Sequence, residues 1–348
     1  MADSTSSIDK PKKSFISQVV TIVLPLALGI TIIYFLVRDI NLAELWDILK
    51  DANWSILLFS LLFGLLGNTI RGYRWKLLIK PLGYAPKVTK LNFAIYGGYA
   101  INFAIPRAGE VWRCGIIAKD EKVPFTKLFG TMLIDRVFDT ITVAVITLFA
   151  FAFNMKFFIT QLNHNQAVLD KITSTLKSPT PYVIIGLTAG LIFIIFKYFS
   201  EYKIIKKIKE AVLDMVHDMK AIWNMKEKGR LFLYTVGIWG SYFCYFYITF
   251  FAFDFTHNLG ITAGLIAFAL SSVSMGIPSN GGLGPWQVAV IASLTLYGVS
   301  HIEATAFATG VFMLQSVWVI LCGLFGIAAL AFTKKPDDTL TVDKPDAK

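Results

Sequence analysis

Six ionisable residues lie in stretches of the sequence that are otherwise apolar: Arg107, Glu110, Arg113, Asp135, Arg136 and Asp139. The first three have i, i+3, i+6 spacing, so on a helix that begins at Pro106 they share one face, with Glu110 within reach of both arginines. Guanidinium groups match phosphate oxygens in a bidentate geometry, and a helix N-terminus favours an anion. Two interpretations are open: a neutral ion-pair clamp between neighbouring segments, or a site where a phosphate competes with Glu110 for Arg107 and Arg113.

A second broken stretch, PSNGGLGPWQ at residues 278–287, carries no charge. Its glycines permit positive φ and close backbone approach. Its amide side chains offer neutral hydrogen bonds, and a packing bend explains the same residues equally well. The neutral candidates of the two broken stretches are Asn102, Asn280 and Gln287. The expected turn residues are Pro106, Gly109, Pro278, Gly281, Gly282 and Gly284.

Asn68, Arg71 and Arg74 form another stripe with i, i+3, i+6 spacing, where an apolar segment meets the expected cytoplasmic side. Long basic side chains at such a position extend along apolar surface and keep their charge in the headgroup region. We therefore interpret these residues as interface anchors.

The sequence offers no residue set for catalysis or metal binding. Cys114, Cys244 and Cys322 lie in or beside apolar stretches without a C-x-x-C motif, and the histidines are scattered. Asp135 and Asp139 are adjacent carboxylates, but Arg136 between them is a poor neighbour for a metal ion. We predict no catalytic residue, no metal and no cofactor.

The class of protein that holds these residues follows from composition. Of 348 residues, 55% are hydrophobic and only 16% are charged, against roughly 25% charged in soluble chains, which argues against a soluble globular protein. A bilayer core requires about 20 apolar residues as helix. Six segments satisfy this requirement: 16–37, 53–70, 129–153, 181–197, 231–253 and 304–331. We predict an all-α integral membrane protein with six transmembrane helices.

Two further apolar regions, 91–118 and 261–298, are each cut by proline and glycine. The first is too short to cross twice, and irregular backbone at membrane depth is tolerated only inside protein or a wet cavity. We interpret both regions as re-entrant hairpins. The order of span, connection, span, hairpin and span occurs twice, and three crossings per half invert the second copy. Such paired broken segments are typical of a transporter with a midplane site.

The chain then divides into two inverted halves. Residues 16–153 form the first membrane repeat and residues 181–331 the second. Within the second repeat, 201–230 has helical apolar periodicity and a net positive charge, which suits either contact with the anionic inner leaflet or packing as a cytoplasmic helix. The remaining segments are a cytoplasmic N-terminal segment (1–15), an extracytoplasmic loop (154–180) and a disordered tail (332–348).

Basic residues are distributed asymmetrically along the chain. It carries 33 Lys+Arg against 23 Asp+Glu, a formal net charge of +10. Most basic residues fall in segments on one side of the predicted spans, which places both termini in the cytoplasm by the positive-inside rule. The positive charge thus reflects orientation and contact with an anionic inner leaflet, and it does not indicate a nucleic-acid partner.

Three motifs carry a resemblance to a known family. They are N-x-x-I-P-R-x-G-E-x-x-R at 102–113, I-D-R-x-x-D at 134–139 and P-S-N-G-G-L-G-P-W-Q at 278–287. In this order, within residues 16–331, they resemble the lysylphosphatidylglycerol synthase transmembrane family, a flippase-like domain. The resemblance implies an integral inner-membrane protein that moves an aminoacylated phospholipid, or a glycolipid or polyprenyl-linked substrate, between leaflets. It also implies that the six intramembrane charges line the headgroup cavity.

Three departures from the family pattern bear on the substrate. No aminoacyl-transferring domain is expected in the short segment after residue 333, so lysine transfer is not implied. Asp135 stands where Glu is commoner, Asn280 where Pro is usual, and Gln287 where Glu is usual. Loss of that last carboxylate weakens the expectation of a cationic headgroup such as a lysyl lipid.

We predict a lipid flippase-like transporter of the bacterial inner membrane, and not an enzyme, with a phospholipid or lipid-linked substrate. The alternative is a membrane enzyme or regulatory partner that acts on lipid-linked or polyprenyl-phosphate-linked envelope precursors. A homo-oligomer and an envelope-synthesis partner are both open on the sequence.

Overall fold

The computed structural model describes residues 42–155, 174, 178–179, 225–277 and 279–333. Several predicted features lie wholly or largely outside these residues: the spans 16–37 and 181–197, the segments 1–15, 154–180, 201–230 and 332–348, and the turn residue Pro278.

The described residues form helices joined by short connections, and no strand occurs among them. In chain order the α-helices are α2 (Leu42–Leu49), α3 (Trp54–Ile79), α4 (Val88–Ala104), α5 (Ala108–Glu121), α6 (Phe125–Phe153), α11 (Lys228–Tyr247), α12 (Asp254–His257), α13 (Gly260–Ser274), α14 (Pro285–Leu296) and α15 (His301–Phe332). Two 3-10 helices, η1 (Lys80–Leu82) and η2 (Ile248–Ala252), continue α3 and α11.

Four helical segments of the described chain are long and apolar enough to cross a membrane: Trp54–Leu82, Phe125–Phe153, Lys228–Ala252 and His301–Phe332. They coincide with predicted spans and confirm the class of all-α integral membrane protein. Large apolar side chains on these segments are exposed, among them Leu148 and Phe153 at 72%. A bilayer solvates such side chains favourably, whereas water does not.

The predicted region 91–118 forms a helical hairpin from α4 and α5. Their close approach requires glycine, because a Cβ on Gly109 would lie 1.8 Å from the carbonyl oxygen of Gly98. The side chain of Asn102 also accepts a hydrogen bond from the backbone N–H of Gly109 (2.8 Å). Contacts between backbone and side chain therefore hold the two helices together near the tip.

The tip and the base of the α4–α5 hairpin are built differently. At the tip, α5 begins at Ala108, and its N-cap residue Arg107 has a left-handed backbone with φ of 65°. Pro106 therefore precedes the helix. The sequence interpretation, which placed Pro106 in the first turn of the helix, is wrong on this point. At the base, a salt bridge joins Nζ of the buried Lys90 to Oε1 of Glu121 (2.7 Å).

The predicted region 261–298 also forms a helical hairpin, from α13 and α14. Gly281, Gly282 and Gly284 in its connection have φ values of +62°, +95° and +87°. Residues with a Cβ rarely adopt this region, so these glycines supply the backbone conformation of the turn. Pro285 follows at the first position of α14, where its missing N–H costs nothing.

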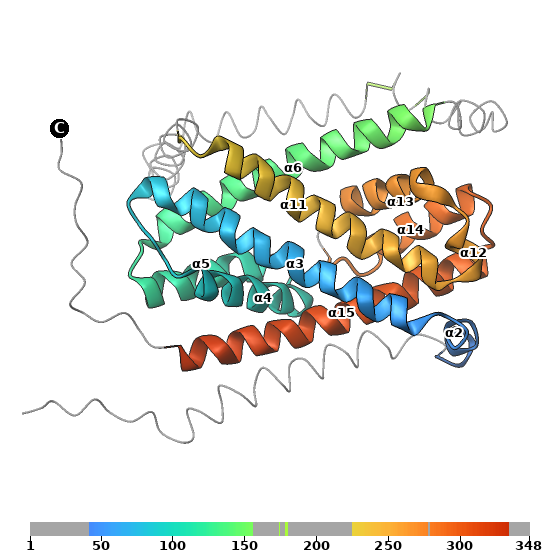
Figure 1. Ribbon diagram of the computed structural model, residues 1–348, viewed down its shortest axis with the longest axis horizontal. Helices are drawn as coiled ribbons and strands as arrows, with labels where there is room; N and C mark the ends of the chain where they lie inside the picture. The colour runs from blue at the N-terminus through green and yellow to red at the C-terminus, as the bar shows by residue number, and fades with distance from the viewer. Residues whose placement is uncertain (1–41, 156–173, 175–177, 180–224, 278, 334–348) are drawn as a thin grey trace, which may run out of the picture.

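The two hairpins lie at opposite ends of the long helices (Figure 1). The α4–α5 hairpin lies where α3 and α15 end, and the α13–α14 hairpin lies where they begin. Small residues bring neighbouring helices close. A Cβ on Gly323 of α15 would lie 2.7 Å from the carbonyl oxygen of Tyr96 on α4, and Gly67 of α3 faces the ring of Tyr242 on α11.

An aromatic core joins α11, α13, α14 and α15. The ring of Phe246 lies 5.9 Å from that of Trp286, 6.2 Å from that of Phe268 and 6.3 Å from that of Phe307. Its contacts with Trp286 and Phe307 are edge-to-face, a favoured geometry for aromatic pairs. Ring packing thus anchors the second hairpin to the long helices.

Candidate functional site

Two arginines of α3 and two aspartates of α6 form a buried ion-pair cluster. Arg71 Nη1 lies 3.0 Å from Asp135 Oδ2 and 2.6 Å from Asp139 Oδ2. Arg74 Nη2 lies 2.7 Å from Asp135 Oδ1 and 2.6 Å from Asp139 Oδ1. The most exposed of the four residues is Asp139, at 6%. Each arginine therefore bridges both carboxylates, and the cluster ties α3 to α6.

This arrangement corrects the interpretation of Asn68, Arg71 and Arg74 as interface anchors. The two arginines are one turn apart on α3, as the two aspartates are on α6, so each pair shares a face and the faces meet. Because α3 continues past them to Ile79, the arginines lie inside the bundle, where ion pairing replaces hydration. Asn68 is buried as well and accepts a hydrogen bond from the hydroxyl of Tyr242 (2.6 Å).

Glu110 of α5 forms an ion pair with Arg136 of α6, with 2.8 Å between Oε1 and Nη2. The prediction that Glu110 pairs with Arg107 and Arg113 is therefore wrong about the partner. The left-handed backbone at Arg107 places that residue outside the helix on which the prediction relied. Arg107 Nη2 instead donates a hydrogen bond to the carbonyl oxygen of Gly276 in the second hairpin (2.9 Å).

Arg113 is buried next to this pair. Its guanidinium carbon lies 4.7 Å from the centroid of the Trp75 ring, and its Nη2 lies 3.7 Å from Asp135 Oδ2. Among the described residues, Nε and Nη2 of Arg113 have no hydrogen-bond partner, nor does Nε of Arg136. Because charged donors without acceptors are costly inside a protein, the cluster retains donor capacity for an anion.

The charges of the cluster do not balance. In the part of the chain that the structure describes, four arginines, Arg71, Arg74, Arg113 and Arg136, surround three carboxylates. The sequence interpretation instead matched Arg107, Arg113 and Arg136 to the three carboxylates. It placed Arg71 and Arg74 of α3 at the membrane interface and therefore did not count them. The structure leaves an excess of one positive charge in the cluster, and Arg107 at the exposed hairpin tip adds a second.

The tips of the two hairpins are in contact. The backbone N–H of Gly281 donates to the carbonyl oxygen of Asn102 (3.2 Å). A Cβ on Gly281 would lie 2.3 Å from the ring of Phe103, so the approach depends on glycine. Together with the hydrogen bond from Arg107 to Gly276, these contacts join the hairpins beside the charged cluster.

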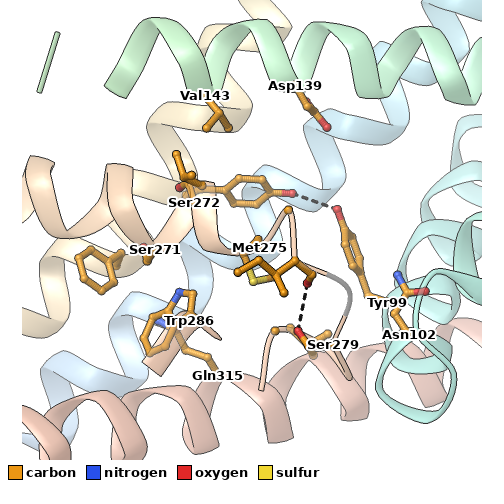
Figure 2. Close-up of a pocket in the computed structure, with 18 of the residues that line it drawn as sticks. Tyr99, Asn102, Asp139, Val143, Ser271, Ser272, Met275, Ser279, Trp286 and Gln315 are labelled. Atoms are coloured by element: carbon orange, nitrogen blue, oxygen red, sulfur yellow. Dashed lines mark hydrogen bonds between the residues drawn. The ribbon is translucent and has the colours of Figure 1, made fainter. Parts of the chain in front are cut away.

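A cavity of about 720 Å³ lies where the tips meet. Charged residues contribute one part of its wall: Arg71, Arg107, Glu110, Arg136 and Asp139. Figure 2 shows Asp139, Tyr99 and Asn102 on one side of this space and Ser271, Trp286 and Gln315 across from them. The cavity therefore combines charged groups with aromatic and neutral hydrogen-bonding walls.

The predicted site residues divide into three groups. The cavity is lined by Asn68, Arg71, Asn102, Arg107, Glu110, Arg136 and Asp139, and by the turn residues Gly281 and Gly282. Asp135 and Arg113 are their buried partners behind the wall. Asn280 is exposed on the turn, and Gln287 accepts a hydrogen bond from the N–H of Gly284 (3.1 Å), which caps α14. Neither of these two belongs to the described cavity wall.

Sequence reasoning missed the aromatic part of the wall. Trp239, Tyr242 and Tyr245 line the cavity from α11 with i, i+3, i+6 spacing. The same spacing identified the arginines as candidates. The aromatic residues were not identified in this way, because aromatic side chains in an apolar span are usually packing residues. The hydroxyl of Tyr242 accepts a hydrogen bond from Arg71 Nε (3.3 Å) and lies 3.5 Å from the hydroxyl of Tyr99. These tyrosines thus connect the cluster to the aromatic wall.

The fold and the site define a class: an all-α integral membrane protein with a buried arginine–carboxylate cluster beside a cavity between two helical hairpins. Within the described ranges, no three His, Cys, Asp or Glu residues gather as metal ligands would. The family model of the lysylphosphatidylglycerol synthase TM region matches residues 22–323. The chain belongs to this family, which confirms the family indicated by the three motifs.

Curated relatives are similar over shorter stretches. The glycosyltransferase AglD of Haloferax volcanii is 28% identical over 130 residues, which cover 37% of this chain and 21% of that protein. The UPF0104 membrane protein MJ1595 of Methanocaldococcus jannaschii is 28% identical over 117 residues, which cover 33% of this chain and 35% of that protein. The matched stretch is thus well under half the length of either relative. No solved structure shows significant similarity to the chain.

Proposed function

We propose that this protein is a flippase-like transporter that moves a phospholipid or lipid-linked headgroup between membrane leaflets. The proposal depends above all on the cavity between the hairpin tips, where arginines lie beside apolar walls. Its volume of about 720 Å³ is in the range of small-molecule sites. A lipid headgroup suits this combination, because its phosphate requires charged donors and the rest of the molecule requires neutral contacts.

Arg136 is the arginine best placed to bind the headgroup. It lines the cavity, its side chain is 34% exposed, and its buried Nε has no hydrogen-bond partner among the described residues. A phosphate bound to Arg136 competes with Glu110 for the same guanidinium. Because Glu110 belongs to α5 and Arg136 to α6, this competition weakens the link between the hairpin and the neighbouring span. Headgroup binding then allows the tip to move, as alternating access requires.

The transport path requires two inverted membrane repeats, 16–153 and 181–331, with hairpins that enter from opposite leaflets. In support, α4–α5 and α13–α14 lie at opposite ends of the long helices and touch at their tips (Figure 1). With both termini in the cytoplasm of a bacterial cell, the base of α4–α5 faces the cytoplasm and the base of α13–α14 faces the outside. A headgroup at the tips then lies between the two membrane surfaces.

A membrane enzyme that acts on lipid-linked or polyprenyl-phosphate-linked precursors is the second candidate. The name of the Haloferax volcanii relative, a glycosyltransferase, favours it. However, the two carboxylates in the cavity wall, Glu110 and Asp139, are both held in ion pairs with arginine. Oε2 of Glu110 has no hydrogen-bond partner among the described residues, but this oxygen is buried and does not face the cavity. A general base must instead direct a free oxygen at the substrate proton. We therefore prefer transport.

Leaflet-resolved exchange in proteoliposomes tests the proposal. The protein is reconstituted with fluorescent phospholipids, and a membrane-impermeant quencher reports how much lipid has changed leaflet. We expect the wild type to exchange lipid and Arg136→Gln to slow exchange at least tenfold, because a hydrogen bond to a charged group contributes about 1.5–3 kcal/mol. The matched control is Arg230→Gln, at an exposed position on α11, which should exchange lipid at the wild-type rate.

Two results would contradict the proposal. If the wild type exchanges no lipid, or if folded Arg136→Gln exchanges lipid as fast as the control, the cavity is not the transport path. If mass spectrometry of the recovered lipid shows a covalent change, the enzyme becomes the better assignment.

A further inference from the structure

The wall of the cavity has two chemically different zones. The cationic zone comes from α3, α5, α6 and the α4–α5 tip and contains all the charged residues among the described lining residues. The neutral zone comes from α11, α13, α14, α15 and the second tip, and every described lining residue there is uncharged. A bound headgroup that spans the cavity therefore meets positive charge at one end and neutral aromatic and polar groups at the other.

The cationic zone favours a ligand that carries net negative charge. Its four clustered arginines exceed its three carboxylates by one positive charge. An uncompensated charge away from water is strongly unfavourable, and one phosphodiester anion would neutralise it. A zwitterionic lipid brings no net charge and leaves the excess in place. A cationic aminoacyl lipid increases it.

The neutral zone favours a headgroup that can accept hydrogen bonds. Trp239 and Tyr245 both line the cavity, and their polar atoms, Trp239 Nε1 and the Tyr245 hydroxyl, are buried without a hydrogen-bond partner in the described structure. An indole N–H only donates, so it must meet an acceptor. An ammonium group has no acceptor atom, whereas the hydroxyl groups of a polyol or sugar both accept and donate. Stacking of an ammonium on the indole face would leave the N–H unsatisfied and would add charge.

From these two zones we infer the substrate class: an anionic phosphodiester lipid whose headgroup is an uncharged polyol or sugar. Its phosphate lies against Arg136, and its hydroxyl groups lie against Trp239 and Tyr245. This inference rests on the proposed function and adds selectivity to it. It also agrees with the uncharged second turn, where Gln287 caps α14 and no carboxylate is available to an ammonium group.

The test compares headgroups on identical acyl chains in the same proteoliposomes. We expect phosphatidylinositol and phosphatidylglycerol to exchange at least tenfold faster than phosphatidylcholine and lysylphosphatidylglycerol. Trp239→Phe removes one hydrogen-bond donor and should lower the ratio of phosphatidylinositol to phosphatidylcholine exchange about fivefold. Trp318→Phe is the matched control, because Trp318 Nε1 also lacks a partner but does not line the cavity. The control should leave the ratio unchanged.

Binding in detergent, measured as thermal stabilisation, separates this inference from the transport proposal. If no lipid is exchanged but phosphatidylinositol still stabilises the protein more than phosphatidylcholine, transport fails and the substrate class stands. If all four lipids exchange and bind equally, transport stands and the substrate class is overturned. Soluble glycerophosphoinositol should bind much more weakly than phosphatidylinositol. Equal binding would show that the ligand is a free phosphodiester and would overturn the lipid assignment.

Discussion

Replacement of Asp135 by Asn would test whether the arginine–carboxylate cluster stabilises the fold. Asp135 is fully buried and accepts from Arg71 Nη1 at 3.0 Å and from Arg74 Nε at 2.8 Å, with Arg113 Nη2 3.7 Å away. An amide is isosteric but uncharged and offers one acceptor oxygen in place of two. Removal of one partner from a buried ion pair costs about 3–5 kcal/mol, because it leaves an uncompensated charge.

The loss can be measured as an apparent unfolding temperature in detergent. A thiol-reactive fluorophore reports unfolding, because Cys114 is free and fully buried in the folded protein. In domains of about 150–250 residues each kcal/mol shifts the midpoint by roughly 2–4 °C. A loss of about 3–5 kcal/mol therefore predicts a midpoint for Asp135→Asn that is lower by roughly 6–20 °C.

The control is Asp47→Asn, which removes the exposed salt bridge between Asp47 and Lys50 (3.0 Å). Exposed pairs contribute about 0–1 kcal/mol, so the midpoint should hardly move. The double variant Asp135→Asn/Arg74→Gln also removes one excess positive charge, so it should be less destabilised than the sum of its single variants. If Asp135→Asn lowers the midpoint no more than Asp47→Asn does, the reasoning about the buried cluster is refuted.

Three further predictions concern the hairpins and the helix ends. Gly109→Ala should separate α4 from α5 and lower the unfolding midpoint, because its Cβ would lie 1.8 Å from a backbone oxygen. Gly115→Ala on the same helix should be neutral or slightly stabilising, because its Cβ would meet no described atom within 4 Å outside the local helix backbone. The hydrogen bond from Lys80 to Glu227 (2.5 Å) lowers the pKa of Glu227 below its ordinary value of 4.5. The contribution of this pair to stability is therefore fully present above pH 4.5 and is lost as the pH falls through the lowered pKa of Glu227. The midpoint of Glu227→Gln should accordingly fall less than that of the wild type between pH 7 and pH 3, and an equal fall would contradict the assignment. In a cysteine-free background, Lys119→Cys should be labelled only from the cytoplasmic side and His301→Cys only from outside; labelling of both from one side would exclude opposed hairpins.

The secondary structure around the site was largely predictable from local sequence. Hydropathy located the four described spans, because a bilayer selects for length and apolar composition within a single helix. Proline and glycine breaks located both hairpins, whose helices cover 88–121 and 260–296 where the sequence indicated 91–118 and 261–298. Helix ends differ by a few residues because capping contacts, such as the one between Gln287 and Gly284, set them.

The pairing of charges was not predictable in the same way. Helical spacing shows that Arg71 and Arg74 share a face, but a long basic side chain at that depth can extend to the membrane surface or into the bundle. The packing of α3 against α6 decides between these outcomes, because it places two carboxylates within 3.0 Å of Arg71. The left-handed backbone at Arg107 likewise takes that residue off the helix of Glu110, and Glu110 pairs with Arg136 on α6.

The sequence by itself thus determined the membrane class, the family motifs and the presence of charges within apolar stretches, because each of these depends on composition and local periodicity. Only the tertiary structure decided which charges meet, that arginines outnumber carboxylates in the cluster, and that the hairpin tips enclose a cavity with an aromatic wall. Those features depend on contacts between helices far apart in the chain, and the rotation and depth of each helix are set by its neighbours.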